Sequence, residues 1–133
     1  MKPIDRYRNV LVRYLTQDDP VQSARATELI EHRVTVRSPG FISVVAMAET
    51  AWVLVRSYHL DDSAVAAAIE RVLQADRFMV EHEQAVFSAM IALKAGRGSF
   101  ADALIGALGV AAGCSRTVTF DRRASRLTEF ERA

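Results

Sequence analysis

The chain has 133 residues, a formal net charge of +1, and a composition that is half hydrophobic and one quarter charged. This length suits one domain, and the balance of residues excludes a disordered chain. The near-zero net charge says nothing about whether the protein binds nucleic acid. The single cysteine, Cys114, excludes an internal disulfide and fits a reducing compartment. No signal peptide and no apolar stretch of roughly 20 residues is present, so we expect a soluble cytoplasmic protein with no membrane partner.

In the first half of the chain, apolar periodicity and turn signals predict alternating strands and helices. Asp19 is a good N-cap, and Pro20 suits the first position of the helix that follows. Ser38-Pro39-Gly40 marks a turn between two β-type runs. The expected elements are a strand at residues 2–5, helices at 9–16 and from Pro20 to about His32, short strands at 34–36 and 41–44, and an apolar helix from Val44 to about Tyr58.

The second half continues the alternation. Asp61 or Asp62 caps an Ala-rich helix, Ser99 caps another, and Gly113 ends it. No repeat or linker interrupts the chain, so we expect one domain over residues 1–133. The expected elements are helices that run from the Asp61 or Asp62 cap to Gln74, at 83–95 and at 100–112, strands at 77–81 and 116–120, and a short helix after Asp121.

Strands separated by helices of this length predict an α/β fold with a parallel sheet and helices on both faces. In such sheets, ligands bind at the carboxyl ends of the strands. Asp5 and Asp121 each follow a predicted strand at such an end.

Glu49 lies in an apolar helix, VVAMAETAWVL, with Val45, Ala46, Trp52 and Val53 three and four residues away. A carboxylate among such neighbours loses hydration, and its charge is costly without a partner. The alternative is that Glu49 points outward from a narrow polar edge of the helix.

Two further acids have structural explanations of their own. Asp102 follows Ser99 by three residues, as in a capping box, and Asp121 is a natural N-cap. Together with Asp5 and Glu49, however, they would gather four carboxylates in one crevice, and such a cluster persists where a divalent cation neutralises it. Oxygen ligands suit Mg²⁺ or Mn²⁺, which support displacement at phosphorus. The sequence has no zinc spacing, P-loop or dinucleotide fingerprint to compete with this reading.

Four segments of the chain resemble one family: NVLVRYLTQDDPVQSARA, FISVVAMAETAWVL, GSFADALIGALGVAAGC and TVTFDRRASRL. They are similar to PIN-domain ribonucleases, specifically the VapC toxins of toxin–antitoxin systems. The resemblance implies a PIN-like fold, with a mostly parallel central sheet of about five strands sandwiched by helices. It also implies a Mg²⁺- or Mn²⁺-dependent endoribonuclease that hydrolyses RNA phosphodiester bonds.

The resemblance assigns roles residue by residue. Glu49 corresponds to the family's second acid, Asp102 to its third and Asp121 to its fourth. Thr119 falls where a hydroxyl often supports the site, and Asn9 matches an Asn that orients the first acid. Family members are typically homodimers silenced by a small antitoxin protein, so we expect both partners here.

The opening departs from the family pattern of Asp-Thr-Asn, because the sequence reads Asp5-Arg6-Tyr7-Arg8-Asn9. Alignment on the strand places Asp5 at the first acidic position, whereas alignment on Asn9 places Tyr7 there. We favour Asp5, since loops tolerate insertions. The last residues, TEFERA, leave little room for the family's final strand.

Arg8 and Arg122 are candidates for binding RNA phosphates, because guanidinium groups match phosphate oxygens. The alternative is that they pair with the site carboxylates. Two other readings of the whole chain remain: a PIN-like domain without catalysis that binds RNA or its antitoxin, and a helical scaffold whose acids are only caps. The scaffold reading predicts a solvent-facing Glu49.

Overall fold

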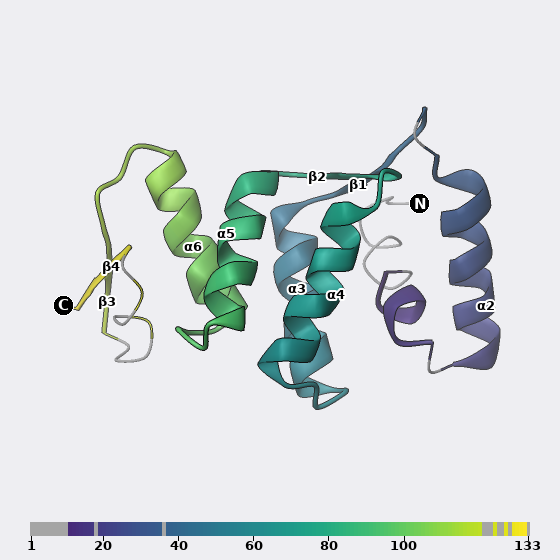
Figure 1. The fold of residues 1–133 in the computed structure, drawn as a ribbon, viewed down its shortest axis with the longest axis horizontal. Helices are drawn as coiled ribbons and strands as arrows, with labels where there is room; N and C mark the ends of the chain where they lie inside the picture. Colours follow the sequence, from purple (N-terminus) through teal and green to yellow (C-terminus); the bar gives the residue numbers. More distant parts are fainter. Residues whose placement is uncertain are drawn as a thin grey trace.

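The computed structural model describes residues 11–17, 19–35, 37–120, 124, 127 and 129–132. The elements form an elongated arrangement, with α2 at one end and the β3–β4 pair at the other (Figure 1). The elements are a helix at residues 11–16, α2 (Pro20–Glu28), the π-helical turn η1 (Leu29–Arg33), β1 (Gly40–Ile42), α3 (Val44–Arg56), α4 (Asp62–Gln74), β2 (Phe78–Val80), α5 (Glu83–Lys94), α6 (Phe100–Ala111), β3 (Thr117–Thr119) and β4 (Phe130–Arg132).

The helices match their sequence predictions closely, because their start signals are local. Asp19 Oδ1 accepts hydrogen bonds from the N–H groups of Val21 (3.0 Å) and Gln22 (2.8 Å), with Pro20 at the first helical position. η1 then extends α2 to about the expected end. At the other end of the chain, α6 stops as predicted before Gly113, whose φ of +94° suits a glycine.

The predicted strand at residues 34–36 is wrong for the two of these residues that the structure describes. Val34 lies in a bend, and Thr35 belongs to no regular element. The Thr35 N–H donates to the Ser38 carbonyl (3.1 Å), and the Ser38 N–H donates back to the Thr35 carbonyl (3.2 Å). These bonds close a tight turn and use the backbone groups that a strand partner would need, so the strand begins only at Gly40.

β1 and β2 form a parallel pair in which Phe41 lies opposite Met79. α3 and α4 make the connection between these strands, as the predicted α/β pattern requires. Beyond the pair, the Glu81 N–H donates to the Ile42 carbonyl (2.9 Å). Parallel pairing is therefore confirmed for these strands.

The expectation that the last residues leave little room for a final strand is wrong. β4 pairs with β3 in parallel, with Val118 opposite Glu131. The Thr117 N–H donates to the Glu129 carbonyl (2.7 Å) and extends the pairing by one bond. Three residues are enough for this strand because Phe130, at its start, is buried in the core.

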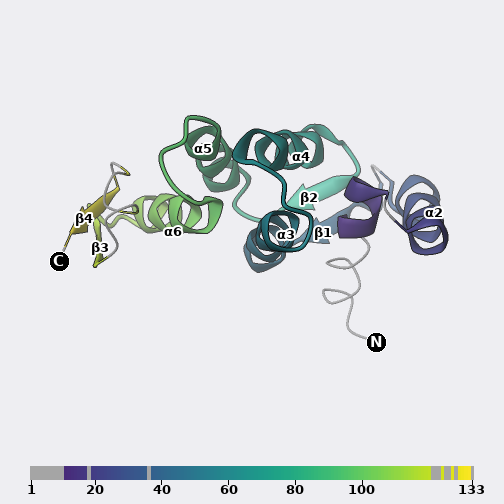
Figure 2. The ribbon, with the colours of Figure 1, turned by 90° about the horizontal axis from the view of Figure 1, so that it is seen from below.

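The α/β class is confirmed, but the described residues do not form one sheet of about five strands. They form two separate parallel pairs, β1–β2 and β3–β4. Both views place α5 and α6 between these pairs (Figures 1 and 2). The predicted strand at 2–5 lies outside the described residues, as does most of the segment where a short helix after Asp121 is expected.

One hydrophobic core joins the central helices, and it fixes α3 relative to α6. Met47 and Leu54 of α3, Ile69 of α4 and Met90 of α5 are fully buried. Phe100 and Leu104 of α6 belong to the same cluster. Within the described range, no helix is long and apolar enough to cross a membrane.

Candidate functional site

The start of α3 is held by two side chains. Ser43 Oγ accepts a hydrogen bond from the Ala46 N–H (3.0 Å), which makes Ser43 the N-cap. Glu81 Oε1 accepts from the Val44 N–H (3.0 Å), and an acid is favourable there because of the helix dipole. Glu81 directly follows β2, so the carboxyl end of the β1–β2 sheet determines where α3 begins.

Glu49 lies in the second turn of α3 and is half-buried. It lines a hollow of about 550 Å³, together with groups from the helix at 11–16, from α2 and from the turn after α3. A half-buried position argues against the scaffold reading, which requires Glu49 to face solvent. We call this space the Glu49 hollow; its lining residues are Val12, Arg13, Gln22, Glu49, Val53, Ser57 and Tyr58.

Arg13 supplies a cation to the Glu49 hollow. Its Nε donates to Gln22 Oε1 (2.8 Å), and its Nη1 donates to Tyr58 Oη (2.8 Å). The guanidinium is therefore oriented by side chains from α2 and from the turn after α3. Sequence reasoning missed this residue, and the signal that could have found it is a lone cation inside the apolar run NVLVRYL.

Asp102 is half-buried in the first turn of α6. Ser99 Oγ accepts a hydrogen bond from the Asp102 N–H (3.2 Å), which confirms the predicted cap. α6 packs against α3, and Ala48 and Ala101 line the same cavity of about 180 Å³. Neither Glu49 nor Asp102 lines this cavity, so the structure places the two acids on neighbouring helices, and Glu49 opens into the Glu49 hollow instead.

Thr119, the predicted supporting hydroxyl, is half-buried on β3. β3 lies on the other side of α6 from α3 (Figures 1 and 2), so the structure does not place Thr119 beside Glu49. The remaining predicted site residues lie outside the described residues: Asp5, Tyr7, Arg8, Asn9, Asp121 and Arg122.

The predicted ligands that the structure describes carry the type of oxygen atom that the predicted metal binds. Glu49 and Asp102 offer carboxylate oxygens, the ligands that Mg²⁺ and Mn²⁺ prefer. In the described part of the chain, no three histidine, cysteine or acidic side chains are close enough to hold a metal ion. Two of the four predicted carboxylates, Asp5 and Asp121, lie outside that part, so the described residues supply half of the set.

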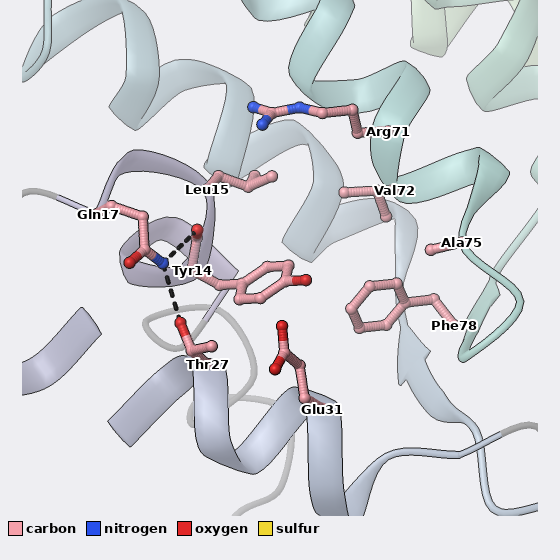
Figure 3. A pocket seen from close by; sticks show the side chains of 9 residues that line it. All are labelled: Tyr14, Leu15, Gln17, Thr27, Glu31, Arg71, Val72, Ala75 and Phe78. Atoms are coloured by element: carbon pink, nitrogen blue, oxygen red, sulfur yellow. Dashed lines mark hydrogen bonds between the residues drawn. The ribbon is translucent and has the colours of Figure 1, made fainter. Parts of the chain in front are cut away.

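A second hollow, of about 350 Å³, contains none of the predicted site residues. Figure 3 shows the rings of Tyr14 and Phe78 facing its centre, with the Glu31 carboxylate below and the Arg71 side chain above. Gln17 Nε2 donates to Thr27 Oγ1 (3.0 Å) at one side and so links the helix at 11–16 to α2. The polar groups at its edge are exposed, and we assign this hollow no role in the chemistry.

Comparison with known proteins identifies the family. The family model described as PIN domain matches residues 8–129. That stretch contains Glu49, Asp102 and Asp121, whereas Asp5 precedes it. No curated protein and no solved structure matches the chain. PIN domains have an α/β fold and are generally nucleases that use divalent metals. Because the match covers most of its length, the chain belongs to the PIN-domain family.

Proposed function

We propose that this chain, as one PIN domain over residues 1–133, is a Mg²⁺- or Mn²⁺-dependent endoribonuclease that acts as the toxin of a toxin–antitoxin pair. The observation that carries the proposal is the position of Glu49, half-buried in a polar hollow of a chain that belongs to a nuclease family. Asp102 lies in the first turn of α6, a helix that packs against α3, which is compatible with a second carboxylate for the same cation.

Each proposed residue has a chemical role. Asp5, Glu49, Asp102 and Asp121 hold the cation through their carboxylate oxygens. When bound, Mg²⁺ or Mn²⁺ activates a water and stabilises charge at the phosphorus. Asn9 orients the first acid. Arg8 and Arg122 hold RNA phosphates, to which their guanidinium groups can donate in pairs.

The proposal also includes one mostly parallel sheet of about five strands, sandwiched by helices. This part of the proposal rests on the resemblance and on the fifth strand that the sequence predicts at residues 2–5; the parallel pairing of β1 with β2 and of β3 with β4 agrees with it in strand direction only. A cognate antitoxin, a homodimer and a cytoplasmic location follow from the resemblance to VapC toxins carried by segments such as GSFADALIGALGVAAGC.

A cleavage assay on total cellular RNA tests the activity. With Mg²⁺ or Mn²⁺ we expect the wild type to cut RNA, and Asp102→Asn and Glu49→Gln to lose activity by roughly 100-fold or more. Loss of a second-shell partner alone costs 10–100-fold, and a ligand should cost at least as much. Glu83→Gln is the matched control, since Glu83 is an exposed acid on α5. An Asp102→Asn protein that cleaves at the wild-type rate would refute the proposed site.

The alternative is a catalytically impaired PIN-like domain that binds RNA or its antitoxin. The inserted residues after Asp5 favour it, and the family match begins only at Arg8. In the same assay, this alternative predicts that the wild type leaves RNA intact with both metals but still retards it on a native gel.

A further inference from the structure

The hollow drawn in Figure 3 lies outside the proposed metal site, yet side chains from four different elements meet around it. They are Tyr14 of the helix at residues 11–16, Glu31 of η1, Arg71 of α4 and Phe78 of β2. We call this space the Tyr14 hollow. Its volume of about 350 Å³ falls within the roughly 300–1,000 Å³ range that is usual for ligand pockets.

The two charged groups of the Tyr14 hollow are unpaired. Figure 3 shows the Glu31 carboxylate and the Arg71 side chain on opposite sides of the space. Within the described part of the chain, neither side chain makes a hydrogen bond or an ion pair. Arg71 lies in the last turn of α4, where the helix dipole favours a cation. That position does not account for a carboxylate on the other side of the same hollow.

The rim of the Tyr14 hollow has two uncommon backbone conformations. Glu31 is the central residue of η1, a π-helical turn in which the Val34 N–H donates to the Leu29 carbonyl (3.2 Å). Gln17 has a φ of +54°, a left-handed conformation that is uncommon for a residue other than glycine. Both kinds of conformation cost free energy and recur at functional sites. The rim therefore favours a ligand-binding role for this hollow.

Two aromatic rings make the Tyr14 hollow suitable for a flat ligand. Tyr14 and Phe78 are half-buried, and their rings face the centre of the space (Figure 3). Leu15 and Val72 add apolar lining. A planar ring can stack on such side chains, and stacking on aromatic residues is how proteins bind the bases of single-stranded nucleic acids.

The charged groups then determine which flat ligand fits. A carboxylate accepts two hydrogen bonds side by side. Guanine is the RNA base whose Watson–Crick edge presents two neighbouring donors, N1–H and the N2 amino group. On the opposite side of the hollow, a guanidinium donates to phosphate oxygens. A guanine nucleotide thus offers a ring for the aromatic side chains, two donors for Glu31 and an anion for Arg71.

We propose that the Tyr14 hollow binds one guanine nucleotide of a single-stranded RNA. The base stacks on Tyr14 and Phe78, its N1–H and N2 amino group donate to Glu31, and Arg71 binds its phosphate. This inference rests on the proposed function, because RNA is the polymer that the nuclease proposal supplies. It deepens that proposal by giving the domain a base preference, and the hollow takes no part in the hydrolysis itself.

The test is the affinity for a fluorescently labelled oligouridine with one guanosine at its centre, measured by anisotropy in EDTA, which prevents cleavage. The comparison oligonucleotides carry inosine or adenosine at that position, since inosine keeps N1–H but lacks the N2 amino group. We expect the wild type to bind the guanosine oligonucleotide roughly tenfold more tightly than the adenosine one, with inosine between them. This comparison changes only the RNA and leaves the protein intact.

Glu31→Gln should lose most of the preference for guanosine, because the carboxamide offers one acceptor oxygen in place of two. Glu28→Gln is the matched control, since Glu28 is an exposed acid at the end of α2, outside the hollow, and its loss should leave the preference unchanged. Both changes lie at exposed positions, so both variants should fold.

Arg71→Gln should weaken the binding of all three oligonucleotides alike. The plot of log K against log salt should become shallower by about 0.7, the value for one phosphate contact on a single strand. Arg25→Gln, which removes an exposed arginine of α2 outside the hollow, should leave the slope unchanged.

The stacking contact is tested with two changes at one position. Tyr14→Leu removes the ring and should raise Kd by roughly tenfold, whereas Tyr14→Phe keeps the ring and should bind as the wild type does. If Tyr14→Leu does not fold, the inosine comparison and Glu31→Gln decide the question.

The outcomes separate this inference from the proposed activity. If the wild type never cleaves RNA with Mn²⁺ but Glu31→Gln removes a preference for guanosine, the nuclease proposal fails and the guanine site stands. If the wild type cleaves RNA but binds the three oligonucleotides with equal Kd, the guanine site is overturned and the activity stands. Equal Kd values for the guanosine oligonucleotide and for free guanosine monophosphate would overturn the assignment to RNA, because the polymer would then add nothing to binding.

Discussion

Two adjacent residues of α3 meet very different surroundings. Glu49 is half-buried at the edge of a hollow, whereas Thr50 points into the core and is 1% exposed. In the described part of the structure, Thr50 Oγ1 has no hydrogen-bond partner. A buried hydroxyl that lacks a partner loses its hydration without replacement, which costs stability.

Replacing Thr50 by valine should therefore raise the free energy of unfolding by about 1 kcal/mol, since a methyl of similar shape takes the place of an unsatisfied hydroxyl. Thr16→Val is the control, because Thr16 Oγ1 donates to the Val12 carbonyl (2.8 Å) and its loss should give no gain. Urea unfolding measures the free energy of unfolding of both variants. A Thr50→Val protein less stable than wild type would show that the hydroxyl is satisfied in solution.

The helix-capping residues that were predicted correctly from the sequence share one property: each bonds a backbone group that is near it in sequence. Asp19, Asp61 and Ser99 each cap a helix through an N–H group two or three residues later. Glu81 caps α3 from 37 residues away, and Arg13 reaches Tyr58 across 45 residues. No local pattern encodes such partners, so both residues emerged only from the structure.

At the scale of elements, α6 and the start of β4 approach each other closely at Gly106, where there is no room for a side chain. A Cβ built on Gly106 would lie 2.6 Å from Phe130 Cε2 and 3.1 Å from Glu129 Cβ. The Phe130 ring is buried at 5% exposure, so it cannot move aside without losing core contacts. The missing side chain thus allows the last strand to dock on α6.

We expect Gly106→Ala to lower the free energy of unfolding by about 1–3 kcal/mol, the usual cost of overpacking. Gly109→Ala is the matched comparison on the same helix, because the Cβ there would meet only Thr117 Oγ1 at 3.2 Å and Cys114 Cβ at 4.0 Å. The higher helix propensity of alanine should offset the free-energy cost of that close contact. Equal stabilities for the two variants in urea would contradict the docking of β4 on α6.

Helices were easier to predict than strands for a physical reason. An apolar stripe and a cap lie within one segment, so α3, α4, α5 and α6 all match their predicted ranges within two residues. A strand needs a partner from elsewhere in the chain, and the partner of β3 is a three-residue segment near the end of the sequence. The arrangement of the sheets could not be read from periodicity, which describes one segment at a time.

For the whole molecule, the two predicted ligands within the described residues come from different helices that the core holds together. A cation bound by both would connect α3 to α6 in addition to that packing. Binding to the folded state alone then stabilises the entire fold.

We therefore expect Mn²⁺ at 100 times its Kd to raise the free energy of unfolding by about 2.7 kcal/mol, visible as a higher Tm that EDTA reverses. Glu49→Gln should lose most of this increase, whereas Glu83→Gln, a change at an exposed position of α5, should keep it. A wild-type Tm that does not respond to Mn²⁺ would favour the non-catalytic alternative.

Trp52 is the only tryptophan in the sequence, and its place on α3 has a spectroscopic consequence. The ring is 58% exposed, lies three residues after Glu49, and carries the Arg56 guanidinium 5.6 Å from its centroid. It also lines the cavity where α3 meets Phe100, at the start of α6. The emission of one intrinsic fluorophore thus comes entirely from the α3–α6 junction, so ligand occupancy there can be followed optically without attaching a label.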